Sequence, residues 1–64
     1  DENNAFIVDY KTDNVVGKDA EKILIERHKE QLKIYKDAVE DYYNLKNVKT
    51  YIYSYTLSKL IEVE

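Results

Sequence analysis

The chain has 64 residues and a mass of 7.6 kDa, which is enough for at most one small domain. It contains no cysteine and one histidine, which excludes disulfides, thiolate zinc sites, thiol catalysis and a multi-histidine metal site. The net charge of −3 gives no overall basic excess for nonspecific binding to nucleic acid.

The first part of the chain predicts a strand followed by a loop. Residues Ala5–Lys11, with the sequence AFIVDYK, are rich in residue types that favour β-structure. Alternation along this strand places Phe6, Val8 and Tyr10 on an apolar face. Residues Thr12–Lys18 contain the only glycine of the chain and predict a loop.

A long helix is predicted from about Asp19 to Tyr43. Acidic residues near its start suit the positive end of the helix dipole, and Asn44–Asn47 is a plausible stop. Side chains at steps of three and four define a stripe that we expect to face the core. The stripe consists of Ala20, Leu24, His28, Gln31, Tyr35, Ala38 and Tyr42, widened by Ile23, Ile34 and Val39.

Two further strands are predicted at the end of the chain. Residues Val48–Tyr55 alternate, with three tyrosines on one face and Thr50, Ile52 and Ser54 on the other. Residues Leu57–Ser58 form a possible tight turn, and Lys59–Glu64 alternates again. The tyrosines could stack bases, but packing of a sheet face is the ordinary role of such residues.

The order of these elements predicts the fold class. We expect an α+β or α/β fold of order β-α-β-β, in which the first two strands are parallel and the last two antiparallel. The resulting three-stranded mixed sheet carries one long helix on one face and leaves the other face open. Together with the lack of methionine, this open face suggests that residues 1–64 form a single partial domain.

Asp9 and Lys11 are the first candidates for chemistry. Period-two alternation places them on one face at the carboxyl end of the predicted strand, where α/β sheets often hold their sites. A carboxylate can bind Mg²⁺, and a nearby lysine can orient water or stabilise the charge of a phosphate. An exposed ion pair at a strand end is the alternative explanation for these two residues.

Gln31 and Tyr35 are four residues apart and share a helix face. On the expected stripe, Gln31 points inward, and a buried amide needs hydrogen-bond partners. It is therefore either a site residue or a structural glutamine that caps a backbone group. His28, one turn earlier, is expected to be a packed and hydrogen-bonded core residue.

Two motifs together resemble a known family. They are Ile7–Asp13, which reads IVDYKTD, and Glu26–Tyr35, which reads ERHKEQLKIY. A strand that ends in D-Y-K, followed by a helix with Q-x-x-x-Y, resembles the RecB-family branch of the PD-(D/E)XK nucleases. Within this branch, the segment from Phe6 to the chain end is similar to the C-terminal nuclease domain of AddA-type helicase-nuclease subunits.

The resemblance implies a role for each matching residue. Asp9 would bind Mg²⁺, the backbone carbonyl of Tyr10 would be a further ligand, and Lys11 would be the catalytic lysine. Gln31 and Tyr35 would line the site and contact the DNA phosphate or the catalytic groups. The family also has an earlier aspartate and an acidic or histidine ligand upstream, which this chain lacks. Asp1 and Glu2 do not replace these ligands, because they are expected to lie in a turn. His28 does not replace them either, because it follows the D-Y-K motif.

The function implied by the resemblance is that of a fragment. The chain would be the C-terminal part of a restriction-endonuclease-like core, in the Mg²⁺-dependent DNA exonuclease domain of a helicase-nuclease that acts in double-strand-break repair and recombination. The fragment alone would be inactive, because it lacks metal ligands, and the ATP-dependent motor would lie elsewhere. The alternative is a small noncatalytic α+β protein-interaction module.

Partners and location follow from the same considerations. The resemblance implies two partners for the parent domain, DNA and a second helicase-nuclease subunit. We expect the fragment to self-associate or to bind the missing part of its domain, because its sheet has an open face and an unpaired edge. The absence of cysteine fits a reducing cytosol, and no apolar run approaches the roughly 20 residues of a membrane span, so we expect a cytoplasmic protein without a membrane partner.

Overall fold

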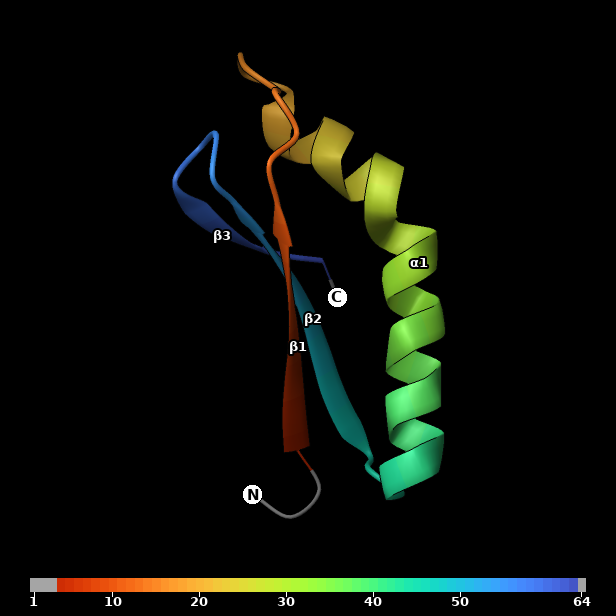
Figure 1. Cartoon of the computed structure of the whole chain (residues 1–64). Coiled ribbons are helices and arrows are strands. Elements are labelled where there is room, and N and C mark those ends of the chain that lie inside the picture. Colours follow the sequence, from red (N-terminus) through yellow and green to blue (C-terminus); the bar gives the residue numbers. More distant parts are fainter. Residues whose placement is uncertain (1–3, 64) are drawn as a thin grey trace.

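A computed structural model describes residues 4–63 of the chain. Its elements follow the predicted order (Figure 1). They are strand β1 (Asn4–Lys11), helix α1 (Ala20–Tyr43), strand β2 (Asn47–Ser54) and strand β3 (Lys59–Glu62). Each predicted element is confirmed, with boundaries that differ by one or two residues. The turn expected at Asp1 and Glu2 lies outside the described residues.

The three strands form one mixed sheet in which β2 is central. β1 runs parallel to β2, with Asn4 opposite Asn47 and Lys11 opposite Ser54. β3 runs antiparallel to β2, with Ile61 opposite Ile52. The predicted three-stranded mixed sheet with one long helix is thereby confirmed, and the chain is α+β. The proposed relation to a restriction-endonuclease-like core remains a prediction.

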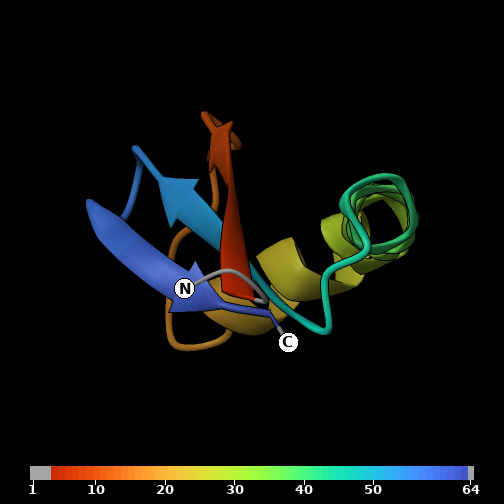
Figure 2. The same cartoon turned by 90° about the horizontal axis from the view of Figure 1, so that it is seen from below.

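The core lies between α1 and one face of the sheet (Figure 2). Leu24 and Leu32 of α1 are fully buried, as is Ile52 at the centre of β2. Thr50 and Ser54 lie on the same side of β2 as Ile52 and are also buried. The predicted division of β2 into two faces is therefore confirmed, and the face without tyrosines is the one that α1 covers.

The buried stripe of α1 differs from the predicted one. Ala20 and Leu24 are buried as expected, but the next fully buried residue is Leu32, which the predicted stripe did not include. The apolar side chain of Leu32 faces the core. Because successive residues of a helix are about 100° apart, its neighbour Gln31 then lies on the flank of the helix. The stripe residues that are exposed instead are Ile23, Gln31, Ile34, Tyr35, Ala38 and Tyr42.

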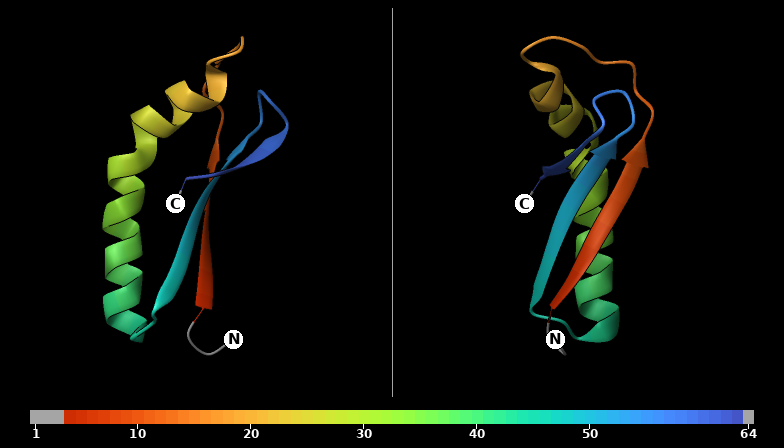
Figure 3. Two further views of the ribbon diagram at one scale, coloured as in Figure 1. Left: turned by 180° about the vertical axis from the view of Figure 1, so that it is seen from behind. Right: turned by 90° about the vertical axis from the view of Figure 1, so that its left-hand side faces the viewer.

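Figure 3 (right) shows the sheet in front of α1, so that one face of the sheet points away from the helix. That face carries aromatic side chains. Phe6 contacts Tyr51 with ring centroids 5.8 Å apart, and Tyr10 contacts both Tyr53 and Tyr55 at 6.0 Å. The predicted apolar face of β1 is thus real but uncovered within residues 4–63. We call this surface the aromatic face; its residues are Phe6, Val8, Tyr10, Tyr51, Tyr53, Tyr55 and Leu60.

Two positive backbone φ angles mark the ends of α1. Gly17 has a φ of 95° in the loop before the helix, a conformation that glycine adopts without strain. Asn44 has a φ of 55° and caps the carboxyl end, where its N–H donates to the carbonyl of Glu40. These residues confirm the predicted loop and the predicted stop. No helix among residues 4–63 combines the length and apolar character needed to cross a membrane.

Candidate functional site

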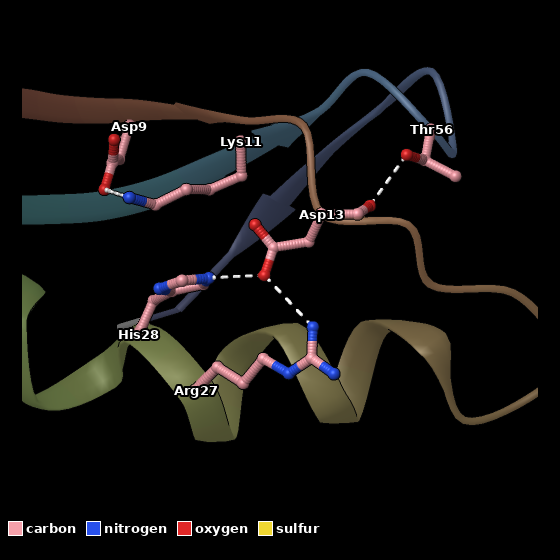
Figure 4. A network of polar contacts seen from close by, with 6 residues as sticks. All are labelled: Asp9, Lys11, Asp13, Arg27, His28 and Thr56. Atoms are coloured by element: carbon pink, nitrogen blue, oxygen red, sulfur yellow. Dashed lines mark hydrogen bonds and ion pairs between the residues drawn. The ribbon is translucent and has the colours of Figure 1, made fainter.

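Asp9 and Lys11 lie together at the carboxyl end of β1. Both side chains are on the face toward α1, and the Lys11 Nζ is 3.0 Å from the Asp9 Oδ2 (Figure 4). Their side chains are 23% and 22% exposed, so the pair is partly shielded and still reachable from solvent. The predicted shared face is confirmed. The ion pair is compatible with both explanations, a functional site and a structural pair.

The backbone carbonyl of Tyr10 points toward the outer edge of the sheet. The carbonyl of Lys11 accepts a hydrogen bond from the N–H of Tyr55, so the backbone of Lys11 faces β2. Backbone groups of successive residues in a strand point to opposite sides, which turns those of Tyr10 away from β2. That side of β1 has no neighbouring strand within residues 4–63. The Tyr10 carbonyl is therefore available to a ligand.

Gln31 and Tyr35 form a hydrogen-bonded pair on α1. The Gln31 Nε2 donates to the Tyr35 hydroxyl over 3.0 Å, as their spacing of four residues allows. Both residues are exposed, which shows that the expectation of a buried Gln31 was wrong. The structural role proposed for Gln31 was that of an inward-pointing glutamine that caps a backbone group, and its exposure removes the basis for that role. What remains is an exposed amide and hydroxyl that can bind polar groups.

The Gln31–Tyr35 pair lies on the flank of α1 that faces β1. His28 defines this flank, because it contacts Asp13 in the segment that follows β1. Gln31 and Tyr35 follow His28 by three and seven residues, which returns them to nearly the same side of the helix. The opposite flank, with Ile25, borders Thr50 and Val63. The two candidate pairs therefore border the same side of the seam between α1 and the sheet.

Asp13 is a polar centre that the sequence interpretation did not identify. Its Oδ2 accepts a hydrogen bond from the Arg27 Nη1 over 3.1 Å and lies 3.0 Å from the His28 Nε2. Its backbone carbonyl accepts a hydrogen bond from the Thr56 Oγ1 over 2.7 Å (Figure 4) and another from the N–H of Val15 over 3.0 Å. The hydrogen bond with His28, reinforced by Arg27, lowers the pKa of Asp13 despite its partial burial. His28 is hydrogen-bonded as predicted, but at the edge of the core.

The described residues offer only some of the donors that a metal site would need. The Asp9 carboxylate and the Tyr10 carbonyl are hard oxygen donors of the kind that Mg²⁺ prefers. Within residues 4–63, no group of three or more histidine, aspartate or glutamate side chains lies close enough to bind a metal. The described residues therefore fit one side of a Mg²⁺ coordination shell, and further ligands would have to come from elsewhere.

Polar groups at this seam suit a phosphate. Lys11 supplies a cation beside a carboxylate, while Gln31 and Tyr35 supply neutral hydrogen-bond donors on the helix flank. The Arg27 guanidinium is half exposed and bound to Asp13. Such a set can hold and orient a phosphate group, but one carboxylate and one lysine are too few to hydrolyse its ester bond unaided.

Comparison with known proteins gives a match that spans the whole chain. The chain is similar to a subunit of the ATP-dependent helicase/nuclease of Anoxybacillus flavithermus (strain DSM 21510 / WK1), with 34% identity over 65 residues. The match includes 100% of this chain, whereas the chain spans only 5% of the length of that relative. The match relates this chain in sequence to one short segment of that ATP-dependent helicase/nuclease subunit. No family model and no solved structure matches the chain.

Proposed function

We propose that this chain is part of the nuclease unit of a DNA helicase-nuclease, and that Asp9 and Lys11 belong to its site for phosphodiester hydrolysis. The observation that carries the proposal is the Asp9–Lys11 pair at the end of β1, in a chain similar to a segment of a helicase/nuclease. The name of the relative includes a nuclease. A partly shielded carboxylate–lysine pair supplies the kind of groups that a nuclease needs.

Each residue of the seam has a proposed task. Asp9 and the Tyr10 carbonyl would supply some of the ligands of a Mg²⁺ ion. When bound, such an ion would activate water and polarise a phosphate oxygen. Lys11 would orient the water or stabilise the negative charge that develops on the phosphate. Gln31 and Tyr35 would donate hydrogen bonds to the DNA backbone. Under this proposal the domain is of the PD-(D/E)XK type, acts in double-strand-break repair, and works beside DNA and a partner subunit in the cytoplasm.

The proposal can be tested in a chimera. The matching segment of the A. flavithermus helicase/nuclease is replaced by this chain, and DNA cleavage and ATP-dependent unwinding are measured separately. We expect cleavage that requires Mg²⁺ and stops when EDTA removes it. Asp9→Asn and Lys11→Ala should abolish cleavage, because each removes a charge from the site, while unwinding continues. Gln31→Leu should reduce cleavage with little change in stability, because its side chain is exposed.

Glu26→Gln is the matched control for Asp9→Asn, since Glu26 is an exposed carboxylate of α1 that forms a surface ion pair with Lys29. It should leave cleavage intact. A chimera that unwinds DNA and retains full cleavage with Asp9→Asn would contradict the site assignment. The 64-residue chain alone should show no cleavage at any Mg²⁺ concentration, since its described residues lack a complete metal site.

The aromatic face favours a second candidate function, a noncatalytic interaction module. Phe6, Tyr10 and Tyr55 are each more than half exposed on it. The largest apolar patch on a soluble monomer often marks a surface that contacts a partner or a further packed layer. The two candidates differ in the chimera, because a module without catalytic residues would tolerate Asp9→Asn and Lys11→Ala together.

A further inference from the structure

Asp13 joins three segments that are distant in sequence. It belongs to the loop after β1, its carboxylate binds Arg27 and His28 of α1, and its carbonyl binds Thr56 in the turn after β2. Figure 4 shows these bonds converging on Asp13 next to the Asp9–Lys11 pair. Its side chain is 21% exposed and that of His28 is 18% exposed, so water competes only partly for their contact. Charge-assisted bonds in such surroundings are stronger than neutral ones.

Apolar packing alone does not fix the position of α1 in full. Leu24 and Leu32 hold the helix on the sheet, but hydrophobic contacts are not directional and permit small slides and rotations. The bonds of Asp13 to Arg27 and His28 are directional and select one position. They act on the flank of α1 that faces β1, and a small rotation of the helix would displace the Gln31–Tyr35 pair relative to Lys11.

Few residues separate Lys11 from the Gln31–Tyr35 pair along the path through Asp13 and His28. Asp13 follows Lys11 by two residues, and Gln31 follows His28 by three residues of continuous helix. Because the helix is rigid over one turn, the Asp13–His28 contact sets the position of Gln31 and Tyr35 relative to Lys11. The bond from Thr56 to the Asp13 carbonyl holds the loop on its other side, and the bond from the N–H of Val15 closes a tight turn within the loop itself.

We propose that Asp13 is a positioning residue of the nuclease site, which holds the Gln31–Tyr35 flank of α1 in register with Asp9 and Lys11. This inference rests on the proposed function. Asp13 does not touch the substrate; it acts through His28 and Arg27. A displacement of reacting groups by about 1 Å can cost about 100-fold in rate, so loss of the Asp13 carboxylate should slow turnover with little effect on DNA affinity.

The test compares Asp13→Ala with Asp13→Glu in the chimera. Alanine removes both carboxylate bonds and keeps the backbone carbonyl that Thr56 binds, whereas glutamate keeps the charge on a longer arm. We expect Asp13→Ala to lower kcat for cleavage roughly 10- to 100-fold, with KM for DNA changed less than about twofold and unwinding unchanged. Asp13→Glu should recover part of the lost kcat. Arg27→Gln, a milder change at a half-exposed residue, should lower kcat in the same direction by less.

The control is Asp19→Ala, which removes an exposed carboxylate at the start of α1 that makes no side-chain capping bond. It should leave kcat unchanged. NMR spectra of the 64-residue chain with Asp13→Ala should retain the sheet and helix signals and lose the contact between the His28 ring and the loop.

Unchanged kcat in Asp13→Ala, alongside inactive Asp9→Asn, would overturn this inference and leave the proposed function standing. A parallel loss of unwinding or folding would also overturn it, because it would indicate a merely structural role. Full activity of Asp9→Asn would instead refute the proposed function itself.

Discussion

At the scale of single residues, the contacts of Asp13 should make stability depend on pH in the acid range. The hydrogen bonds from His28 and Arg27 hold the pKa of Asp13 below its ordinary value of 3.8 in the folded protein. The unfolded chain therefore binds this proton more readily than the folded chain does. The contribution is fully present above the ordinary value and is lost as the pH falls through the lower, folded-state pKa.

We expect the free energy of unfolding of the 64-residue chain to fall below about pH 4, and to fall less in Asp13→Asn. The difference between the two proteins should be constant near neutral pH and shrink on acidification. Urea titrations at a series of pH values measure it. The exposed Asp19→Asn serves as the matched variant, because it removes a carboxylate and leaves the contacts of Asp13 in place. A gap between the Asp13 variant and the unsubstituted chain that widens toward acid pH would contradict the lowered pKa.

At the scale of elements, Leu32 and Ile34 provide a sharp test of how α1 is oriented. Leu32 is fully buried, whereas Ile34, two residues later, is 66% exposed. Leu32→Ala should cost about 2–5 kcal/mol, because it removes a buried side chain and leaves a cavity. Ile34→Ala should change stability by no more than about 0.5 kcal/mol. Thermal unfolding of the two variants measures this contrast. Equal destabilisation by both substitutions would contradict the orientation of α1 in which Leu32, and not Ile34, faces the sheet.

Element types could be predicted because local signals were unambiguous. β2 alternates strictly over Thr50, Ile52 and Ser54, and the structure buries these three residues. Asn44 marks the end of α1 by adopting the left-handed conformation that asparagine tolerates. The strand order followed from the parallel first pair and the short connection between β2 and β3.

The orientation of α1 could not be predicted with the same accuracy. Both Gln31 and Leu32 fit a stripe that begins at Leu24, since steps of seven and eight residues each return to nearly the same side of a helix. Only the sheet beneath decides between them, and it selects the apolar Leu32. The Asp9–Lys11 pair was found because period-two alternation is local. Asp13 was missed because its partners lie 14 and 15 residues away, a distance over which sequence spacing carries no signal.

At the scale of the whole molecule, the two faces of the sheet are chemically different. One carries the core beneath α1 and the candidate site at its margin. The other is the aromatic face. It also carries Lys49 and Glu62, whose opposite charges cancel. A neutral aromatic surface is poorly suited to the phosphate backbone of DNA, which requires basic residues. Any DNA contact of this chain should therefore be made at the seam near Lys11, and the aromatic face should pack against protein.

In the isolated chain, we expect the aromatic face to bind a second copy weakly. Phe6, Tyr10 and Tyr55 are 69%, 61% and 57% exposed, so with Val8 and Leu60 the exposed apolar area is on the order of 500 Å². This is near the upper end of the largest patch on a typical monomer and below the roughly 800 Å² per partner of a standard interface.

Sedimentation of the 64-residue chain should therefore show a weak monomer–dimer equilibrium. Tyr10→Thr, which keeps a strand-forming residue and removes an exposed ring, should weaken the association about tenfold or more, since burial of an aromatic side chain contributes about 1.5–3 kcal/mol. Tyr42→Thr makes the same chemical change on α1, where Tyr42 is 79% exposed and is not part of the aromatic face, and should leave the equilibrium unchanged. A monomer at every concentration would contradict self-association, and equal weakening by both variants would show that another surface forms the dimer.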